Sequence, residues 1–112
     1  MERTQIDKLN LREAIEDFLA QPTIAIAGVS RTDKTAPGNL IFDKLSKAGH
    51  LVYAVNPHAL KIQGETCYPD LYSLPRLPDG VIITTHPDRV FDIIKACIER
   101  GISRVWMHRS FG

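Results

Sequence analysis

Two strand–helix–strand patterns with short connections most constrain how this chain can fold. The strands are predicted at residues 23–28, 50–57, 79–85 and 102–108, and the helices between them at 37–49 and 86–101. A helix that joins two strands through short links makes them parallel, with a right-handed crossover. The sequence therefore predicts an α/β fold with a mainly parallel sheet and helices on both of its faces.

The spacing of apolar residues supports these assignments. Residues 23–28 read TIAIAG, with no polar side chain after the first, as in a strand that is covered on both faces. In residues 86–101, apolar side chains recur at helical spacing from Val90 to Ile98. Both segments are therefore expected to contribute to the core.

Three further segments complete the predicted organisation. A helix is expected over residues 10–20, with Asn10 as its cap, because its apolar residues recur on one helical face. Residues 58–78 contain three prolines and predict an irregular segment with a short strand and one turn of helix. Trp106 and Met107, on the last strand, are expected in the core.

Composition narrows the class of protein. A chain of 112 residues predicts a single domain, with a helix in residues 1–21 and a core in residues 22–112. The net charge of +1 gives no reason to expect a nucleic-acid partner. No apolar run approaches a membrane span, and the charged N-terminus is unlike a secretory signal, so a cytoplasmic protein is expected. Cys67 and Cys97 are expected to be buried free thiols.

Three strand ends are the predicted place for chemistry. Ligands of open parallel sheets bind beyond the carboxyl ends of the strands, where the strand order reverses. The residues that follow the strands there are Gly28-Val29-Ser30, Asn56-Pro57 and Thr84-Thr85-His86-Pro87. They are small, polar or proline residues, and we expect all three groups to lie at one edge of the sheet.

The first strand end has the form of an anion-binding turn. Gly28 removes a side chain where the chain turns, and Ser30 supplies a hydroxyl. Pro37 opens a helix whose free amides point back into the loop, and Arg31 and Lys34 are available to add positive charge. These features favour a phosphate-bearing ligand, although a plain strand-to-helix loop has the same form.

The residues that are missing from this turn limit the classes of ligand that it could bind. A dinucleotide site has the spacing G-x-G-x-x-G and an acidic residue after the second strand. Here positions 30 and 33 are Ser and Asp, and Asn56-Pro57 follows the second strand, which argues against a redox nicotinamide site. No P-loop lysine motif occurs either. The pattern favours an adenine nucleotide that is bound and does not transfer hydride.

Catalysis and metal binding have weak support in the sequence. Thr32 stands where a hydrolase elbow has its second glycine, so Ser30 is not expected to be a nucleophile. The four histidines lack metal-ligand spacing. His86 and His108 follow strands, and they are the candidates if the protein is an enzyme.

The ordered set of motifs resembles a known family. The motifs are the Gly-Val-Ser strand end, the Pro-Gly helix start, VYAVNP, GETCYPDLYSLP, VIITTHPDRV and RVWMH. In this order they resemble the small CoA-binding domain proteins of the YccU type, which are similar to the nucleotide-binding domain of the succinyl-CoA synthetase alpha subunit. The resemblance covers residues from about 22 to 110.

The resemblance implies a Rossmann-like three-layer sandwich that binds coenzyme A outside the strand ends. By position, it implies that Gly28, Val29 and Ser30 face the CoA phosphates, with Lys34 close to one of them. The remaining implied contacts come from Asn56 and Pro57 beside the adenosine, and from Thr84, Thr85 and Pro87 on the next strand.

The chain departs from this family after its last predicted strand. The family continues with a glycine-rich turn, a helix and a strand, whereas this sequence stops at Gly112. We therefore expect a shortened core whose uncovered face is covered by a second copy or by a partner subunit.

Three functional hypotheses stay open at this point. The first is a non-catalytic module that binds CoA or acyl-CoA. The second is an enzyme, or enzyme subunit, of acyl-CoA or adenine-nucleotide chemistry that uses His86 or His108. The third is a regulatory subunit whose pocket no longer serves a ligand.

Overall fold

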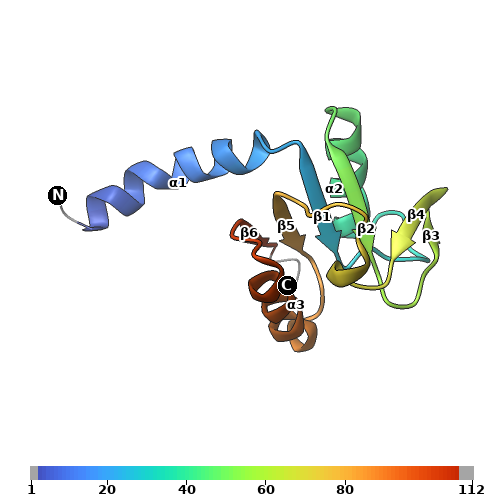
Figure 1. Cartoon of the computed structure of the whole chain (residues 1–112). Coiled ribbons are helices and arrows are strands. Elements are labelled where there is room, and N and C mark those ends of the chain that lie inside the picture. Colours follow the sequence, from blue (N-terminus) through green and yellow to red (C-terminus); the bar gives the residue numbers. More distant parts are fainter. Residues whose placement is uncertain (1–2, 109–112) are drawn as a thin grey trace.

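In the residues that it describes, a computed structural model of the chain has one six-stranded sheet and three α-helices (Figure 1). It describes the backbone of residues 3–108 and the side chains of residues 11–108. The helices are α1 (Arg3–Leu19), α2 (Pro37–Lys47) and α3 (Pro87–Arg100), with a short 3-10 helix, η1 (Leu71–Ser73). The strands are β1 (Thr23–Ala27), β2 (Leu51–Val55), β3 (Lys61–Ile62), β4 (Glu65–Tyr68), β5 (Gly80–Ile83) and β6 (Val105–Met107).

The sheet has the strand order β3-β4-β2-β1-β5-β6. β1 lies at the centre and pairs in parallel with both β2 and β5, so that Ala27 stands opposite Val55 on one side and Ile83 on the other. β4 and β6 add to the sheet in parallel, and β3 pairs antiparallel with β4. The strand order therefore reverses at β1, and the predicted short strand in the irregular segment is a β3–β4 hairpin.

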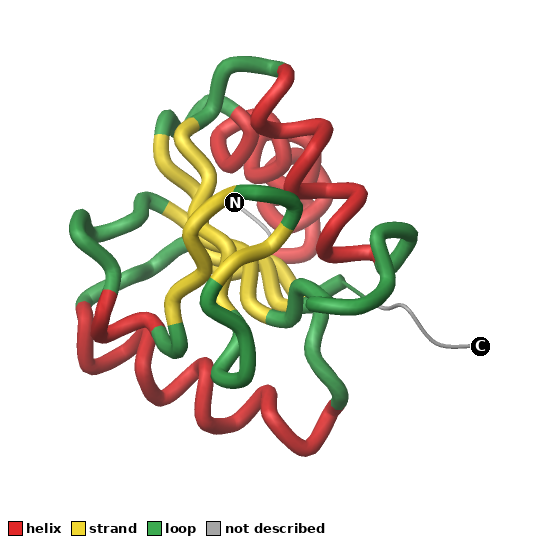
Figure 2. The backbone as a smooth tube through the Cα atoms, turned by 90° about the vertical axis from the view of Figure 1, so that its right-hand side faces the viewer, coloured by secondary structure: helices red, strands yellow, loops and turns green. Residues whose placement is uncertain are grey.

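α2 and α3 form the outer layers on opposite sides of the sheet (Figure 2). Ile24 and Ile26 of β1 point into the core beneath α2, together with Phe42. Ala25 and Ala27 point the other way, into the core beneath α3 and η1. Because strand side chains alternate between faces, β1 presents its large residues to one layer and its small residues to the other. The predicted Rossmann-like three-layer sandwich is confirmed.

The buried cysteines are part of these cores, as predicted. Cys67 and Cys97 are free and buried, 4% and 1% exposed. Burial raises the pKa of both thiols, so at neutral pH they are protonated and act as small apolar side chains.

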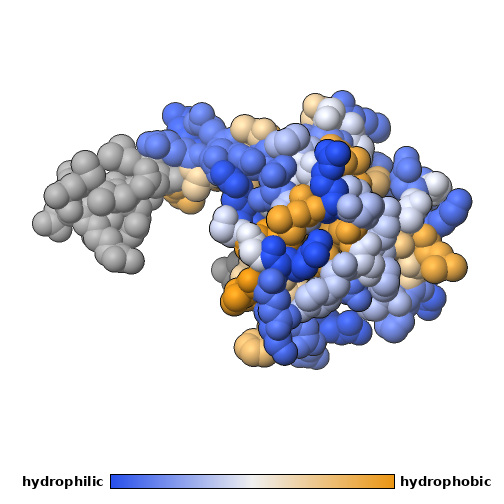
Figure 3. All heavy atoms as spheres, viewed as in Figure 1, coloured by the Kyte–Doolittle hydropathy of each residue, from blue (hydrophilic) through white to orange (hydrophobic). Residues whose placement is uncertain are grey.

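The first helix differs from the prediction. It begins at Arg3 and not at Asn10, and it extends from the body of the molecule as an arm (Figure 1). The coloured part of this arm is mostly hydrophilic with a few small apolar spots (Figure 3). Leu11, on the arm, is 66% exposed. The expected apolar face is therefore not buried as a whole, since only the last turns of the helix reach the sheet.

Two contacts join the end of α1 to the sheet. Phe18 is 4% exposed and packs edge-to-face on Trp106 of β6, with 5.9 Å between the ring centroids. Its ring also fills the space beside Gly80, where a Cβ atom would lie 2.8 Å from Phe18 Cε2. Arg104 Nε donates to Asp17 Oδ2 at 2.6 Å, and this bond holds the pKa of Asp17 below its usual value.

The prediction that Trp106 and Met107 belong to the core is wrong. They are 39% and 54% exposed, respectively. β6 pairs only with β5 among the described strands and forms the edge of the sheet, where Trp106 packs against Phe18. Ile98, on α3, is also exposed, because its position on the helix faces away from the sheet.

We predict that Phe18→Ala lowers the free energy of unfolding by about 3 kcal/mol, because it leaves a cavity beside Gly80 and Trp106. Urea denaturation followed by circular dichroism measures the change. The matched control is Leu11→Ala on the exposed arm, which we expect to change stability by about 0.5 kcal/mol or less. Equal effects of the two substitutions would contradict the packing described here.

Candidate functional site

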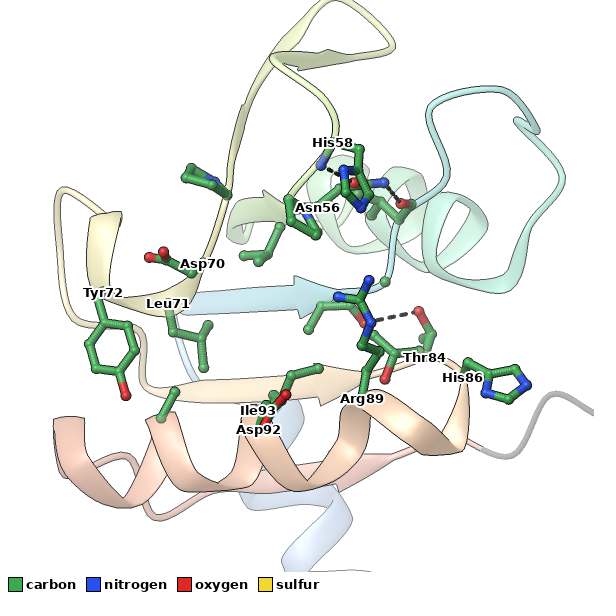
Figure 4. A pocket seen from close by; sticks show the side chains of 18 residues that line it. Asn56, His58, Asp70, Leu71, Tyr72, Thr84, His86, Arg89, Asp92 and Ile93 are labelled. Atoms are coloured by element: carbon green, nitrogen blue, oxygen red, sulfur yellow. Dashed lines mark hydrogen bonds between the residues drawn. The ribbon is translucent and has the colours of Figure 1, made fainter.

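A cavity of about 490 Å³ opens at the carboxyl edge of the sheet, on the face that carries α3 and η1 (Figure 4). It begins where β1, β2 and β5 end and continues between η1 and α3. Its walls are mostly apolar, and they include Ala27, the small residue that β1 places on this face. A largely apolar cleft at the reversal of strand order is the usual ligand site of such a fold.

The cavity brings together all three predicted strand ends. Six of the nine predicted ligand-binding residues line it: Gly28, Val29, Asn56, Pro57, Thr84 and Thr85. Ser30, Lys34 and Pro87 are not among the residues that line it. The Ser30 hydroxyl instead accepts a hydrogen bond within its own loop, and Pro87 is the first residue of α3.

The backbone turn at Gly28 packs directly on the end of β5. Gly28 has a φ of +111°, and a Cβ atom there would lie 2.6 Å from Thr84 Oγ1 and 2.8 Å from Thr85 N. A Cβ on Gly38 would meet the same Thr84 hydroxyl at 2.8 Å. That hydroxyl donates to the carbonyl of Ala27 at 3.1 Å. Any side chain at Gly28 would therefore be strained and would separate the strand ends that frame the cavity.

The loop after Gly28 is held by one buried side chain. Asn39 is 1% exposed, and its Oδ1 accepts from Ser30 N at 2.7 Å. Its Nδ2 donates to Ser30 O at 2.8 Å and to Gln63 Oε1 at 2.9 Å. Asn39 thus ties the loop both to the start of α2 and to the β3–β4 turn.

The polar groups of the loop largely bond to one another. Ser30 Oγ accepts from Thr32 N at 3.2 Å and from Asp33 N at 3.0 Å. Asp33 Oδ1 in turn accepts from Thr35 N and from Thr35 Oγ1, and these bonds lower the pKa of Asp33. The serine hydroxyl therefore occupies the position beside two amides that an incoming anion would take.

Asn56 is also fixed within the protein. Its Nδ2 donates to the carbonyl of Val29 at 2.7 Å, and its Oδ1 accepts from His58 N at 2.7 Å (Figure 4). Arg31 Nη1 donates to His58 O at 3.1 Å, which adds a second link between the two loops. These bonds shape the mouth of the cavity, and they leave Asn56 as a positioning residue.

Thr85 and Arg89 carry polar groups that have no such partner. Thr85 Oγ1 is buried and makes no hydrogen bond in the described structure. Arg89 lines the cavity from the first turn of α3, and it forms no ion pair among the described residues. His86 lies at the rim, 75% exposed, where its Nδ1 caps α3 by accepting from Asp88 N.

Sequence reasoning missed the wall that η1 and α3 form. Leu71 and Tyr72 line one side of the cavity, and Tyr72 Oη donates to a carboxylate oxygen of Glu99, which raises the pKa of Tyr72. The lining residues of α3 are Arg89, Asp92, Ile93 and Ala96. Their spacing of three, four and seven residues marks one helical face in the sequence, but only the fold shows that this face lies opposite η1 across the cavity.

The structure gives two further findings about the described residues. In residues 3–108, no helix combines the length and the apolar character that crossing a membrane requires. Among residues 11–108, whose side chains are described, no three His, Cys, Asp or Glu residues gather in a way that would hold a metal ion.

Residues 22–110 match the family described as CoA binding domain. The chain is 30% identical over 90 residues to acetate–CoA ligase (ADP-forming) II of Archaeoglobus fulgidus. This similarity covers 79% of the chain but only 13% of the ligase, so the chain spans a small part of that curated relative.

Solved structures with the same fold include small proteins and large synthetases. A hypothetical protein from Pyrococcus horikoshii has a TM-score of 0.79 and 28% identity, covering 95% of this chain and 75% of that one. A dinucleotide-forming acetyl-coenzyme A synthetase from Candidatus Korarchaeum cryptofilum, solved with phosphate and ADP, has a TM-score of 0.75 and 28% identity. The match covers 88% of this chain and 21% of the synthetase.

We predict that Asn39→Ala lowers the free energy of unfolding by about 2 kcal/mol, because it removes the buried amide that pairs with both part-buried backbone groups of Ser30. Chemical denaturation measures the loss. Ser46→Ala, on the exposed side of the same helix, is the control and should change stability by about 0.5 kcal/mol or less. A loss for Asn39→Ala as small as that of the control would refute the role of Asn39.

We predict that Thr85→Val raises the stability of the free protein by about 1 kcal/mol, because it replaces a buried hydroxyl without a partner by a methyl group. For a domain of this size, the melting temperature should rise by about 4–8 °C. Thr66→Val, at an exposed position, serves as the control for replacing a solvated threonine by valine. A fall in melting temperature for Thr85→Val would mean that its hydroxyl is already satisfied.

Proposed function

The chain belongs to the CoA binding domain family, and from this premise we propose that it binds coenzyme A, or an acyl-CoA, in the cavity at the carboxyl edge of its sheet. The single observation that carries the proposal is the close packing of the Gly28 backbone against Thr84 at the cavity. This contact brings the ends of β1 and β5 together where the strand order reverses, which is where such folds bind the phosphates of a nucleotide.

The composition of the cavity supports a ligand with both apolar and charged parts. Val55, Leu71 and Ile93 offer an apolar wall, while Arg89 offers a cation. Coenzyme A has an adenine ring and a long uncharged arm, which suit the apolar wall, and phosphates, which suit the cation. Asn56 and Pro57 directly follow β2, where a dinucleotide site has an acidic residue for the ribose hydroxyls, and this favours CoA over a dinucleotide.

We further propose that the protein binds this ligand without catalysing a reaction on it. His86 supports this view, because its ring nitrogen Nδ1 caps α3 and faces Asp88 at the exposed rim. His108, the other histidine candidate, is not among the residues that line the cavity. Both residues therefore lack the pairing with a nucleophile inside the cavity that covalent catalysis needs.

The relatives suggest how a binding domain of this kind is used. The Archaeoglobus and Korarchaeum proteins are much longer than this chain, and each is named for a reaction that involves CoA. We propose that this chain acts as the CoA-binding part of a cytoplasmic system, with a second copy or a partner subunit beside the exposed strand β6.

We predict that calorimetry detects binding of CoA and acetyl-CoA, with weaker or no binding of NAD and AMP. Gly28→Leu should abolish CoA binding, because its side chain would collide with Thr84 and Thr85. Ala96→Leu should weaken CoA binding at least about tenfold by filling the cavity from α3, where leucine suits the helix. Ala14→Leu on the exposed arm is the matched control and should leave affinity unchanged.

The results of these measurements distinguish a CoA-binding module from an enzyme and from a protein that binds none of these ligands. Equal, weak or absent binding of all four ligands by the folded protein would sink it. Hydrolysis of acetyl-CoA that is lost in His86→Ala would favour an enzyme over a binding module. Far-UV circular dichroism of each variant distinguishes loss of the site from loss of the fold.

A further inference from the structure

We propose that Arg89 is the main ionic ligand for the diphosphate of the bound nucleotide and that the Thr85 hydroxyl is a second donor to it. This inference rests on the proposed function and deepens it. The cation that binds phosphate is then Arg89 at the start of α3, and not Arg31 or Lys34 of the glycine loop, which the sequence favours.

The glycine loop has few groups left to offer an anion. Ser30 N is bonded to Asn39, and the amides of Thr32 and Asp33 are bonded to Ser30 Oγ. Lys34 is not among the residues that line the cavity. The loop therefore provides space at Gly28, and the charge has to come from elsewhere.

Arg89 is placed to provide that charge. Of the lysines and arginines among the described residues, it is the one that lines the cavity. In Figure 4 its guanidinium extends from α3 across the cavity, between Thr84 on one side and Asn56 and His58 on the other. It makes no ion pair with any described carboxylate, although Asp92 lies one turn further along α3. A guanidinium held open in a cleft can bind two phosphate oxygens at once.

Thr85 adds an independent sign that a polar partner is missing. Its Oγ1 is buried without a hydrogen bond, and the residue lines the same cavity four positions before Arg89. Buried hydroxyls are nearly always bonded, so we infer that the Thr85 side chain turns its unpaired hydroxyl into the cavity when a ligand supplies an acceptor.

The remaining charges set the direction of the ligand. Asp70 and Asp92 line the part of the cavity between η1 and α3, and their carboxylates repel phosphate. The phosphates are thereby directed towards Arg89 and the end of β1, and an uncharged part of the ligand enters the space between η1 and α3. The group that crosses the end of β1, where the chain turns at Gly28, is then the diphosphate.

The test compares Arg89→Gln with Arg76→Gln, which removes the same charge from an exposed residue that does not line the cavity. Calorimetry with CoA and with 3′-dephospho-CoA measures the effect on two ligands that share the diphosphate. We expect Arg89→Gln to weaken both by roughly 10- to 100-fold, as for a lost charge-assisted hydrogen bond. Arg76→Gln should bind both ligands like the unaltered protein, and Arg89→Lys should recover part of the lost affinity.

A second variant tests the hydroxyl. Thr85→Val should weaken both ligands several-fold even though we expect it to stabilise the free protein. Opposite changes in melting temperature and affinity would distinguish a ligand contact from a structural one. An unchanged affinity of Thr85→Val would remove the threonine from the proposal.

Each remaining outcome decides a separate point. Loss of CoA affinity without loss of 3′-dephospho-CoA affinity would assign Arg89 to the 3′-phosphate and overturn the diphosphate assignment. Normal binding by Arg89→Gln, with binding abolished in Gly28→Leu, would leave the proposed function standing and refute the inference. If the unaltered protein binds neither ligand, the proposed function itself fails.

Discussion

The contact between the turn at Gly28 and the end of β5 is the constraint on which the rest of the site depends. β1 and β5 are neighbours in the sheet, and their carboxyl ends approach until only a hydrogen atom fits between Gly28 and Thr84. Gly38, at the start of α2, packs on the same threonine. The end of β1, the start of α2 and the end of β5 thus meet at Thr84, and this contact forms the floor of the cavity.

The alternation of isoleucine and alanine in β1 explains why the cavity lies on one face only. The isoleucines fill the layer beneath α2, whereas Ala25 and Ala27 leave space beneath α3 and η1. The sheet itself is close-packed at its centre, so the hollow opens where side chains are small and strands end. The five residues of β1 therefore contribute both to the close packing beneath α2 and to the space beneath α3 in which the cavity lies.

The fold and the location of the site could be predicted because both depend on local signals. Apolar runs, prolines at helix starts and glycine turns gave the strands, the helices and the three strand ends that meet at the cavity. The roles of Ser30 and Asn56 could not be predicted, because their hydrogen bonds join the site loops to each other and to α2, across 9 and 27 positions of the chain. The burial of Trp106 could not be judged either, since it depends on what lies over an edge strand.

The network around Asn39 and Asn56 has a consequence for the thermodynamics of recognition. Both side chains hold loops that border the cavity, so the conformational entropy of these loops is lost when the protein folds and not when a ligand arrives. A rigid mouth selects its ligand by shape and charge and does not close around a range of molecules. Binding should therefore raise the temperature at which the whole domain melts, because the site exists only in the folded chain.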